Sequence, residues 1–206
     1  MGMSVSIRKF GGAVATALVL TVALTGCSSD DPAAQGLPQG APATVQADDV
    51  PITAPYDGLR PTRVRVPKIE ADSSLLAVAV DSAGQIAVPT ASKPMQAAWF
   101  RLSPVPGAVG PAIILGHVDG DAQEGIFAKL GQLVKGDEII VDRSDGQVLK
   151  FVVSSETQIP KEQFPTDAVY GKTDKPELRL ITCGGVFDHA AHSYKDNVVV
   201  YADLKS

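Results

Sequence analysis

Two side chains of this sequence carry groups that suit thiol chemistry. Cys183 follows the apolar run Leu180-Ile181-Thr182 and precedes two glycines, and His117 lies in Leu115-Gly116-His117-Val118-Asp119, where another apolar run ends. A cysteine thiolate is a strong nucleophile, and an imidazole can remove and return protons near neutral pH. Most unpaired cysteines are small buried hydrophobes, but the glycines after Cys183 and the available base favour a functional thiol.

The N-terminus indicates export. Arg8 and Lys9 precede an apolar run from about Ala13 to Leu24, which is the order of a secretory signal peptide. This run is shorter than the roughly 20 apolar residues that a membrane-spanning helix needs. It ends in Leu24-Thr25-Gly26-Cys27, which resembles a bacterial lipobox. We therefore expect a lipoprotein-type signal peptide over residues 1–26, with Cys27 as the lipid attachment site; an ordinary cleaved signal or an uncleaved anchor are the alternatives.

The rest of the chain divides into a tether and one domain. Residues 27–59 are rich in Ala, Pro, Gly, Gln and Asp and lack apolar periodicity, so we expect a disordered tether. Residues 60–206 are of a size that can bury a core as one domain. The chain has two cysteines, so lipidation of Cys27 would leave Cys183 as a free thiol. A net charge of -5 without a Lys/Arg cluster argues against nucleic-acid binding.

Short apolar strands punctuated by turns must position Cys183 and His117. Alternation and apolar runs predict strands at residues 62–66, 76–80, 85–88, 112–115, 138–142, 148–155, 178–182 and 198–202. Asp81-Ser82-Ala83-Gly84 and Asp145-Gly146 are typical hairpin turns. The one predicted helix is short, at residues 126–133. Many short strands indicate an all-β barrel or sandwich.

Several motifs along this domain occur in a recognisable order. They are Trp99-Phe100, Pro106-Gly107 with Gly110-Pro111-Ala112, Gly116-His117-Val118-Asp119, the run Leu180 to Gly185, and the run Tyr194 to Ala202. Their order and spacing resemble those of sortases, most closely the actinobacterial class F type, over roughly residues 60–203. The resemblance implies an all-β, eight-stranded barrel with short helices.

The resemblance also implies an activity. A sortase is a cysteine transpeptidase that cleaves an LPXTG-like sorting signal between Thr and Gly and passes the acyl group to an amine of a peptidoglycan precursor such as lipid II, or of a surface protein. Cys183 would form the thioacyl-enzyme, and His117 would act as general acid and then base. The implied partners are sorting-signal proteins and the amine acceptor. The lipid anchor at Cys27 adds the cytoplasmic membrane, to whose outer face it would attach the chain. No cofactor or metal is expected.

The third residue of the sortase site departs from the family pattern. The family has an arginine shortly after the nucleophile, and Lys195 stands at the matching place in Tyr194-Lys195-Asp196-Asn197. An ammonium supplies charge but not the planar fork of a guanidinium. Thr182 and Asn197 are expected to support the substrate or the oxyanion, and Arg179 is a weaker candidate substitute for the missing arginine.

Other interpretations carry less weight. A degenerate sortase that binds sorting signals or wall components without turnover is the main alternative, motivated by Lys195. An L,D-transpeptidase would have its base close to its nucleophile, whereas 66 residues separate these two (183 − 117). His189 and His192 are expected in a solvated loop. Asp119, Asp121 and Glu124 lack the full calcium-loop pattern, so a polar turn without metal is expected there.

Overall fold

The computed structural model describes residues 58–81 and 84–205. The predicted signal peptide, Cys27 and nearly all of the predicted tether lie outside the described residues, so these assignments stay predictions. Within the described ranges, no helix is long and apolar enough to cross a membrane.

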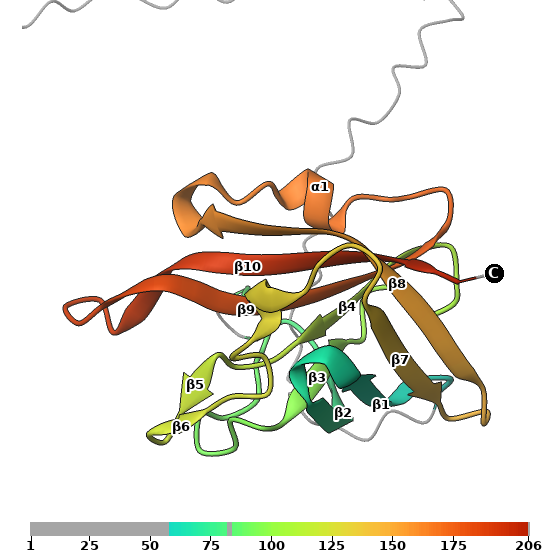
Figure 1. The fold of residues 1–206 in the computed structure, drawn as a ribbon, viewed down its shortest axis with the longest axis horizontal. Helices are drawn as coiled ribbons and strands as arrows, with labels where there is room; N and C mark the ends of the chain where they lie inside the picture. The colour runs from blue at the N-terminus through green and yellow to red at the C-terminus, as the bar shows by residue number, and fades with distance from the viewer. Residues whose placement is uncertain (1–57, 82–83, 206) are drawn as a thin grey trace, which may run out of the picture. The chain divides into compact units, whose positions relative to one another are not determined.

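Eight strands close into a barrel in the order β1-β2-β3-β4-β9-β10-β8-β7 (Figure 1). Pairing is parallel between β2 and β3 and between β4 and β9, and antiparallel elsewhere. The prediction of an all-β, eight-stranded barrel with short helices is confirmed. The barrel strands are β1 (Pro61–Val66), β2 (Ala71–Val78), β3 (Ala97–Phe100), β4 (Gly110–Leu115), β7 (Glu138–Arg143), β8 (Val148–Pro160), β9 (Pro176–Asp188) and β10 (Ser193–Leu204).

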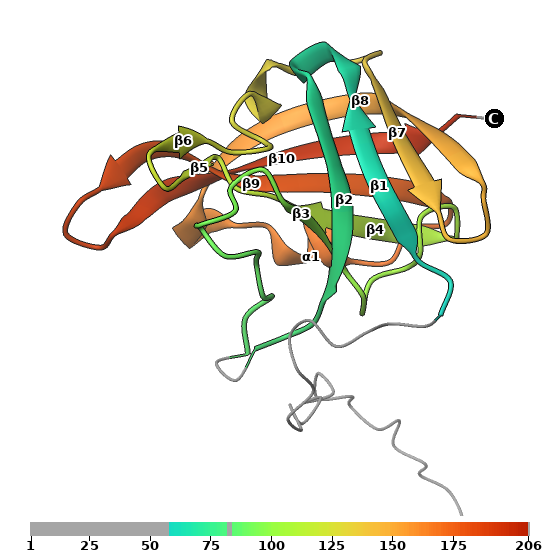
Figure 2. The same cartoon turned by 90° about the horizontal axis from the view of Figure 1, so that it is seen from below.

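The remaining elements are short. A two-stranded sheet of β5 (Asp119–Gly120) and β6 (Gln123–Glu124) follows β4, and α1 (Thr166–Tyr170) lies between β8 and β9. Three 3₁₀ turns complete the set: η1 (Pro67–Ile69), η2 (Leu130–Gln132) and η3 (Lys161–Gln163). In Figure 2, the β5–β6 sheet lies at the same end of the barrel as the hairpin between β9 and β10.

Two local predictions were wrong. The predicted helix at residues 126–133 reduces to η2, because Ile126, Phe127, Leu130 and Leu133 bury their side chains from an irregular segment rather than from one helix face. On either side of the predicted turn, Asp81 N donates a hydrogen bond to Gln85 O at 2.8 Å. However, the predicted strand at residues 85–88 is only a single bridge between Val80 and Ile86.

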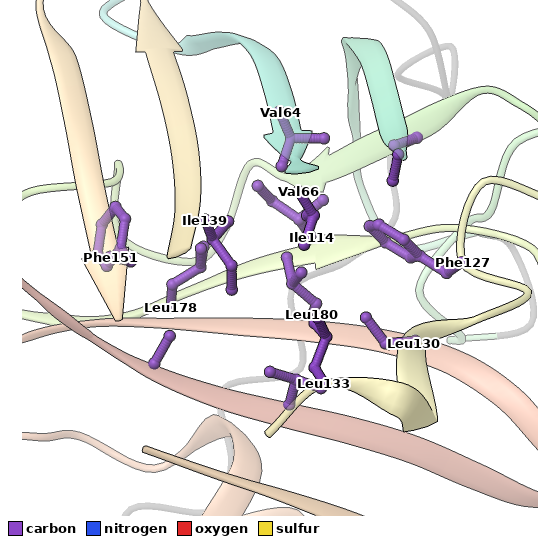
Figure 3. Packing of buried hydrophobic residues seen from close by; sticks show 14 of the residues in the cluster. Val64, Val66, Ile114, Phe127, Leu130, Leu133, Ile139, Phe151, Leu178 and Leu180 are labelled. Carbon is purple, nitrogen blue, oxygen red and sulfur yellow. The ribbon is translucent and has the colours of Figure 1, made fainter. Parts of the chain in front are cut away.

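The strands separate two apolar clusters by alternation. Residues of β9 and β10 with even numbers, such as Leu178, Leu180 and Val200, join the main core inside the barrel with Val64, Phe151 and others (Figure 3). Trp99, 1 % exposed, also belongs to this core. The barrel interior is therefore filled by side chains, and the chemistry must lie elsewhere.

The second cluster lies on the outer face of β4, β9 and β10. Leu115, Ile181 and Val199, all odd-numbered, pack there with Val169 of α1. Odd-numbered positions of these three strands thus face outward, and beyond this apolar row the same face continues toward Cys183 within β9 and toward the end of β4, which precedes His117.

Candidate active site

Strand register pairs Cys183 of β9 with Asn197 of β10, and His117 follows two residues after the end of the neighbouring strand β4. Leu115 of β4 pairs with Ile181 of β9, and Gly116 N donates to Ile181 O at 3.1 Å just beyond the ladder. Continuing this register by two residues sets His117 beside Cys183. On the other side of β9, Asn197 of β10 is the direct partner of Cys183.

Alternation puts this row on the outer face. Residues 117, 183 and 197 are each two positions from residues 115, 181 and 199, and side chains two positions apart on a strand face the same way. The polar row therefore borders the apolar row described above. All three polar residues are half-buried. The expectation that His117 follows the end of a strand is met, whereas Cys183 lies inside β9, which continues to Asp188.

Hydrogen bonds hold His117 in place from two sides. Its Nε2 lies 2.5 Å from the main-chain carbonyl of Pro89, in the segment between β2 and β3. Its own carbonyl accepts a hydrogen bond from Phe127 N at 3.0 Å. A carbonyl accepts only, so Nε2 carries the proton in this contact, and Nδ1 is the nitrogen left for proton transfer.

Gly125 allows the close approach that fixes the His117 backbone. A Cβ at this position would lie 2.3 Å from the His117 carbonyl oxygen. We expect Gly125→Ala to displace the imidazole and lower kcat by about tenfold or more, since small misplacements of catalytic groups are costly. Gly131→Ala is the matched control, because its Cβ would meet nothing closer than 3.7 Å. Steady-state kinetics that show equal losses in both variants would contradict this role.

Two glycines shape the strand immediately after Cys183. A Cβ on Gly184 would lie 2.7 Å from Val198 Cγ2, and Gly185 has a φ of +74°. The β9–β10 register shifts at this point, with Gly185 and Val186 together facing Lys195. Cys183 is a free thiol, so it is available as the nucleophile that the sequence predicts.

Lys195 lies beyond this register shift and points to a different partner. Its ammonium is 3.7 Å from Asp188 Oδ2, and its side chain is 62 % exposed. Asp188 also accepts hydrogen bonds from the main-chain N–H groups of Ala191 and Ala190, which together with Lys195 lower the pKa of the carboxyl. The expected role of Lys195 stays a prediction, and the residue opposite Cys183 is Asn197.

Thr182 turns its side chain away from this surface. It is 4 % exposed, and within the described ranges its hydroxyl has no hydrogen-bond partner. Only its backbone, paired with Val198, borders the site.

The unpartnered hydroxyl leads to a prediction on stability. A buried polar group without a partner is unfavourable by about 1–3 kcal/mol, so we expect Thr182→Val to raise the free energy of unfolding by about 1 kcal/mol in denaturant titrations. Thr157→Val, at an exposed position of β8, is the control. A clear loss of stability in the buried variant would show that the hydroxyl is satisfied after all.

Arg179 does not reach the site. It lies four residues before Cys183 on the same face, and its guanidinium pairs with Glu177 at 2.5 Å and stacks over the Tyr201 ring at 4.4 Å. With 4 % exposure it is a buried structural residue, so the geometry gives no support to its use as a substitute for the family arginine.

The other polar candidates form structural contacts. Asp119 Oδ2 accepts a hydrogen bond from the Tyr194 hydroxyl, and Glu124 lies 3.9 Å from Lys129 Nζ. No group of three or more His, Cys, Asp and Glu side chains with metal-binding geometry occurs among residues 58–81 and 84–205. His189 packs edge-on against Phe187 at 5.1 Å in the exposed hairpin. The sequence did not predict the link between Asp119 and Tyr194, because the two are 75 residues apart.

Several solved sortase structures share this fold. Sortase C-1 from Actinomyces oris has 22 % identity and a TM-score of 0.55, covering 70 % of this chain and 73 % of that one. A lid mutant of sortase A from Corynebacterium diphtheriae has 23 % identity and a TM-score of 0.53, covering 70 % and 69 %. A Clostridium perfringens sortase D5 transpeptidase has 17 % identity and a TM-score of 0.52, covering 70 % and 78 %.

Comparison with curated proteins gave no match. The sequence itself matches the model of the sortase domain over residues 64–205, which is most of the chain and nearly all of the barrel. At identities of 17 to 23 %, the structural matches show the fold, and the match to the sortase domain shows the family. The chain belongs to the sortase family.

Proposed function

We propose that this protein is an active cysteine transpeptidase that joins a sorting-signal peptide to an amine. The observation that carries the proposal is the pairing of Cys183 with Asn197 on the outer face of a sortase barrel, beside the strand β4 whose register with β9, if continued by two residues, leads to His117. A nucleophile, a proton carrier and a hydrogen-bond donor are the three groups that acyl transfer through a thioester requires.

Acylation would begin with attack of the Cys183 thiolate on the threonine carbonyl of an LPXTG-like signal. The tetrahedral intermediate collapses with breakage of the Thr–Gly peptide bond, and the glycine amine leaves with a proton from His117. Because Nε2 is bound to the Pro89 carbonyl, Nδ1 is the nitrogen placed to donate. The products of this step are a thioacyl-enzyme and the released C-terminal peptide.

Deacylation would run the same steps in reverse with a different amine. An amine of a peptidoglycan precursor or of a surface protein attacks the thioester carbonyl and gives its proton to His117. The C–S bond breaks, the new amide is released, and Cys183 leaves as thiolate. Water in place of the amine would give hydrolysis by the same route, so acceptor binding decides the balance between transfer and hydrolysis.

Stabilisation of the oxyanion falls to donors near Cys183. Asn197 presents an amide N–H₂ on the strand position opposite the nucleophile, and within the described part of the chain its side chain forms no hydrogen bond. Lys195 would have to leave Asp188 to take part, although an ion pair this exposed holds it weakly. We therefore assign the principal donor role to Asn197 and a secondary, electrostatic role to Lys195.

The proposed cellular setting follows from the N-terminal sequence. Lipidation at Cys27 would anchor the chain to the outer face of the cytoplasmic membrane, and residues 27–59 would act as a tether that lets the barrel reach the lower cell wall. Class F membership rests on the sequence motifs, while the structural matches named above are of classes C, A and D. The lipid anchor and the class F assignment are thus both proposed from the sequence.

Intact-mass analysis tests the proposed activity. The protein is incubated with an LPXTG peptide, with and without an amine, and both the enzyme mass and the peptide products are followed. A thioacyl adduct on Cys183 together with amine-dependent product supports the transpeptidase. Absence of both from a folded protein whose thiol reacts with iodoacetamide, across several peptide variants, would favour a non-catalytic protein that binds sorting signals or wall components.

A further inference from the structure

Two residues of the sequence motifs have no part in the mechanism above. Asp119 ends the motif that contains His117, and Tyr194 begins the motif that contains Asn197. The Tyr194 hydroxyl donates a hydrogen bond to Asp119 Oδ2. This bond connects the β5–β6 hairpin to the β9–β10 hairpin, two segments that lie at the same end of the barrel in Figure 2.

Asp119 is rigidly coupled to His117. It is two residues away and begins β5, which pairs with β6 through Asp119 and Glu124. Gly125 N donates to Val118 O at 2.8 Å and closes this short hairpin. The position of the Asp119 carboxylate therefore restrains the position of the His117 backbone, because this hairpin is short and hydrogen-bonded.

Tyr194 is coupled in the same way to the nucleophile strand. It pairs with Phe187 across the β9–β10 hairpin, and the two rings meet edge-to-face with centroids 5.0 Å apart. The bond to Asp119, followed by burial and the negative charges of Asp119 and the Cys183 thiolate, raises the pKa of Tyr194 to about 12. The phenol therefore stays protonated, and stays a donor, at any physiological pH.

The ladder between β4 and β9 does not by itself fix His117 relative to Cys183. Its last pair is Leu115 with Ile181, so neither His117 nor Cys183 is inside it. Beyond that pair, Gly116 N to Ile181 O is a single main-chain bond. Among the described residues, Tyr194 to Asp119 is the one side-chain hydrogen bond that joins the segment 117–124 to the segment 183–197.

We propose that Tyr194 and Asp119 form a clasp that positions the His117 imidazole relative to the Cys183 thiol. Both are positioning residues: they act through the His117 loop and the β9–β10 hairpin and do not touch the reacting atoms. This inference rests on the proposed transpeptidase function, because positioning matters only if His117 and Cys183 react together.

The test is a double-mutant cycle on the full-length protein in detergent. Tyr194→Phe keeps the ring that packs on Phe187 and removes only the hydroxyl, and Asp119→Ala removes the acceptor. We expect each variant to lower kcat by about tenfold with KM within about twofold, the scale expected for a misplaced catalytic group. The double variant should match the single ones, since either change breaks the same bond.

Two further variants separate positioning from general damage. Asp119→Asn keeps an oxygen that can accept from the Tyr194 hydroxyl, so it should recover most of the lost kcat. Tyr201→Phe removes a hydroxyl from the same strand without touching the clasp and should leave kcat unchanged. Single losses that multiply in the double variant, or a Tyr194→Phe variant with more than half the original kcat, would overturn the proposal.

A second readout does not depend on turnover. The chain has three histidines, so the His117 ring resonances can be assigned by NMR with one substitution each at His189 and His192. We expect the His117 resonances to shift in Tyr194→Phe and to stay in place in Tyr201→Phe. If no peptide is turned over by the unmodified protein, the proposed function fails while this readout still decides on the clasp, and an unmoved His117 spectrum refutes it.

Discussion

Replacement of Cys183 by alanine is expected to abolish acyl transfer, with a fall in kcat of about 10⁴-fold or more. The thiolate forms the covalent intermediate, and nothing else in the row of His117, Cys183 and Asn197 can take its place. Removal of the sulfur from a half-buried position that is not part of the main core should leave the barrel folded. Product formation and the thioacyl adduct are measured by mass spectrometry.

Two controls make this expectation specific. Cys183→Ser keeps a nucleophilic atom of lower reactivity and should still fail to accumulate an adduct at neutral pH, because a hydroxyl there is not ionised. Thermal unfolding of Cys183→Ala should differ little from that of the unmodified protein. Turnover that persists in a well-folded Cys183→Ala protein would exclude this thiol as the nucleophile.

The fold was accessible from the sequence where strands alternate or are uniformly apolar. Residues 112–115 and 178–182 were recognised as strands because buried runs of this kind are short and end at glycines. The strand Ala97–Phe100 was missed, since four residues give too little alternation to detect. The segment Thr166–Tyr170 was missed as a helix for the same reason of length.

The thiol and the imidazole of the site could also be found from the sequence. His117 and Cys183 are recognisable because each follows an apolar run, although in the structure Cys183 lies inside β9 and only His117 lies past the end of its strand. The pairing of Cys183 with Asn197 was not predictable, because the shift at Gly185 and Val186 changes which residue of β10 faces which residue of β9. The resemblance to sortases pointed to Lys195, and its ammonium lies 3.7 Å from Asp188 in the structure.

Asn197 and Lys195 are the two candidates for stabilising the oxyanion. We expect Asn197→Ala to lower kcat/KM by about 100-fold or more, the scale of losing one oxyanion donor. Lys195→Ala should lower it by less than about fivefold, because an exposed ammonium paired with Asp188 contributes mainly through charge. Single-turnover acylation of the LPXTG peptide measures both effects on the same step.

Conservative variants then identify the property that matters at each position. Asn197→Asp keeps the shape and removes the N–H donors, so it should fail as badly as Asn197→Ala if donation is the role. Lys195→Arg retains the charge and should change the rate little, whereas a large gain would mean that lysine is a poor form of the family arginine. The reverse pattern, with Lys195→Ala inactive and Asn197→Ala unaffected, would return the arginine's role to Lys195. Because Asn197 is opposite Cys183 in the strand register and Lys195 lies past the bulge, the register predicts the first pattern.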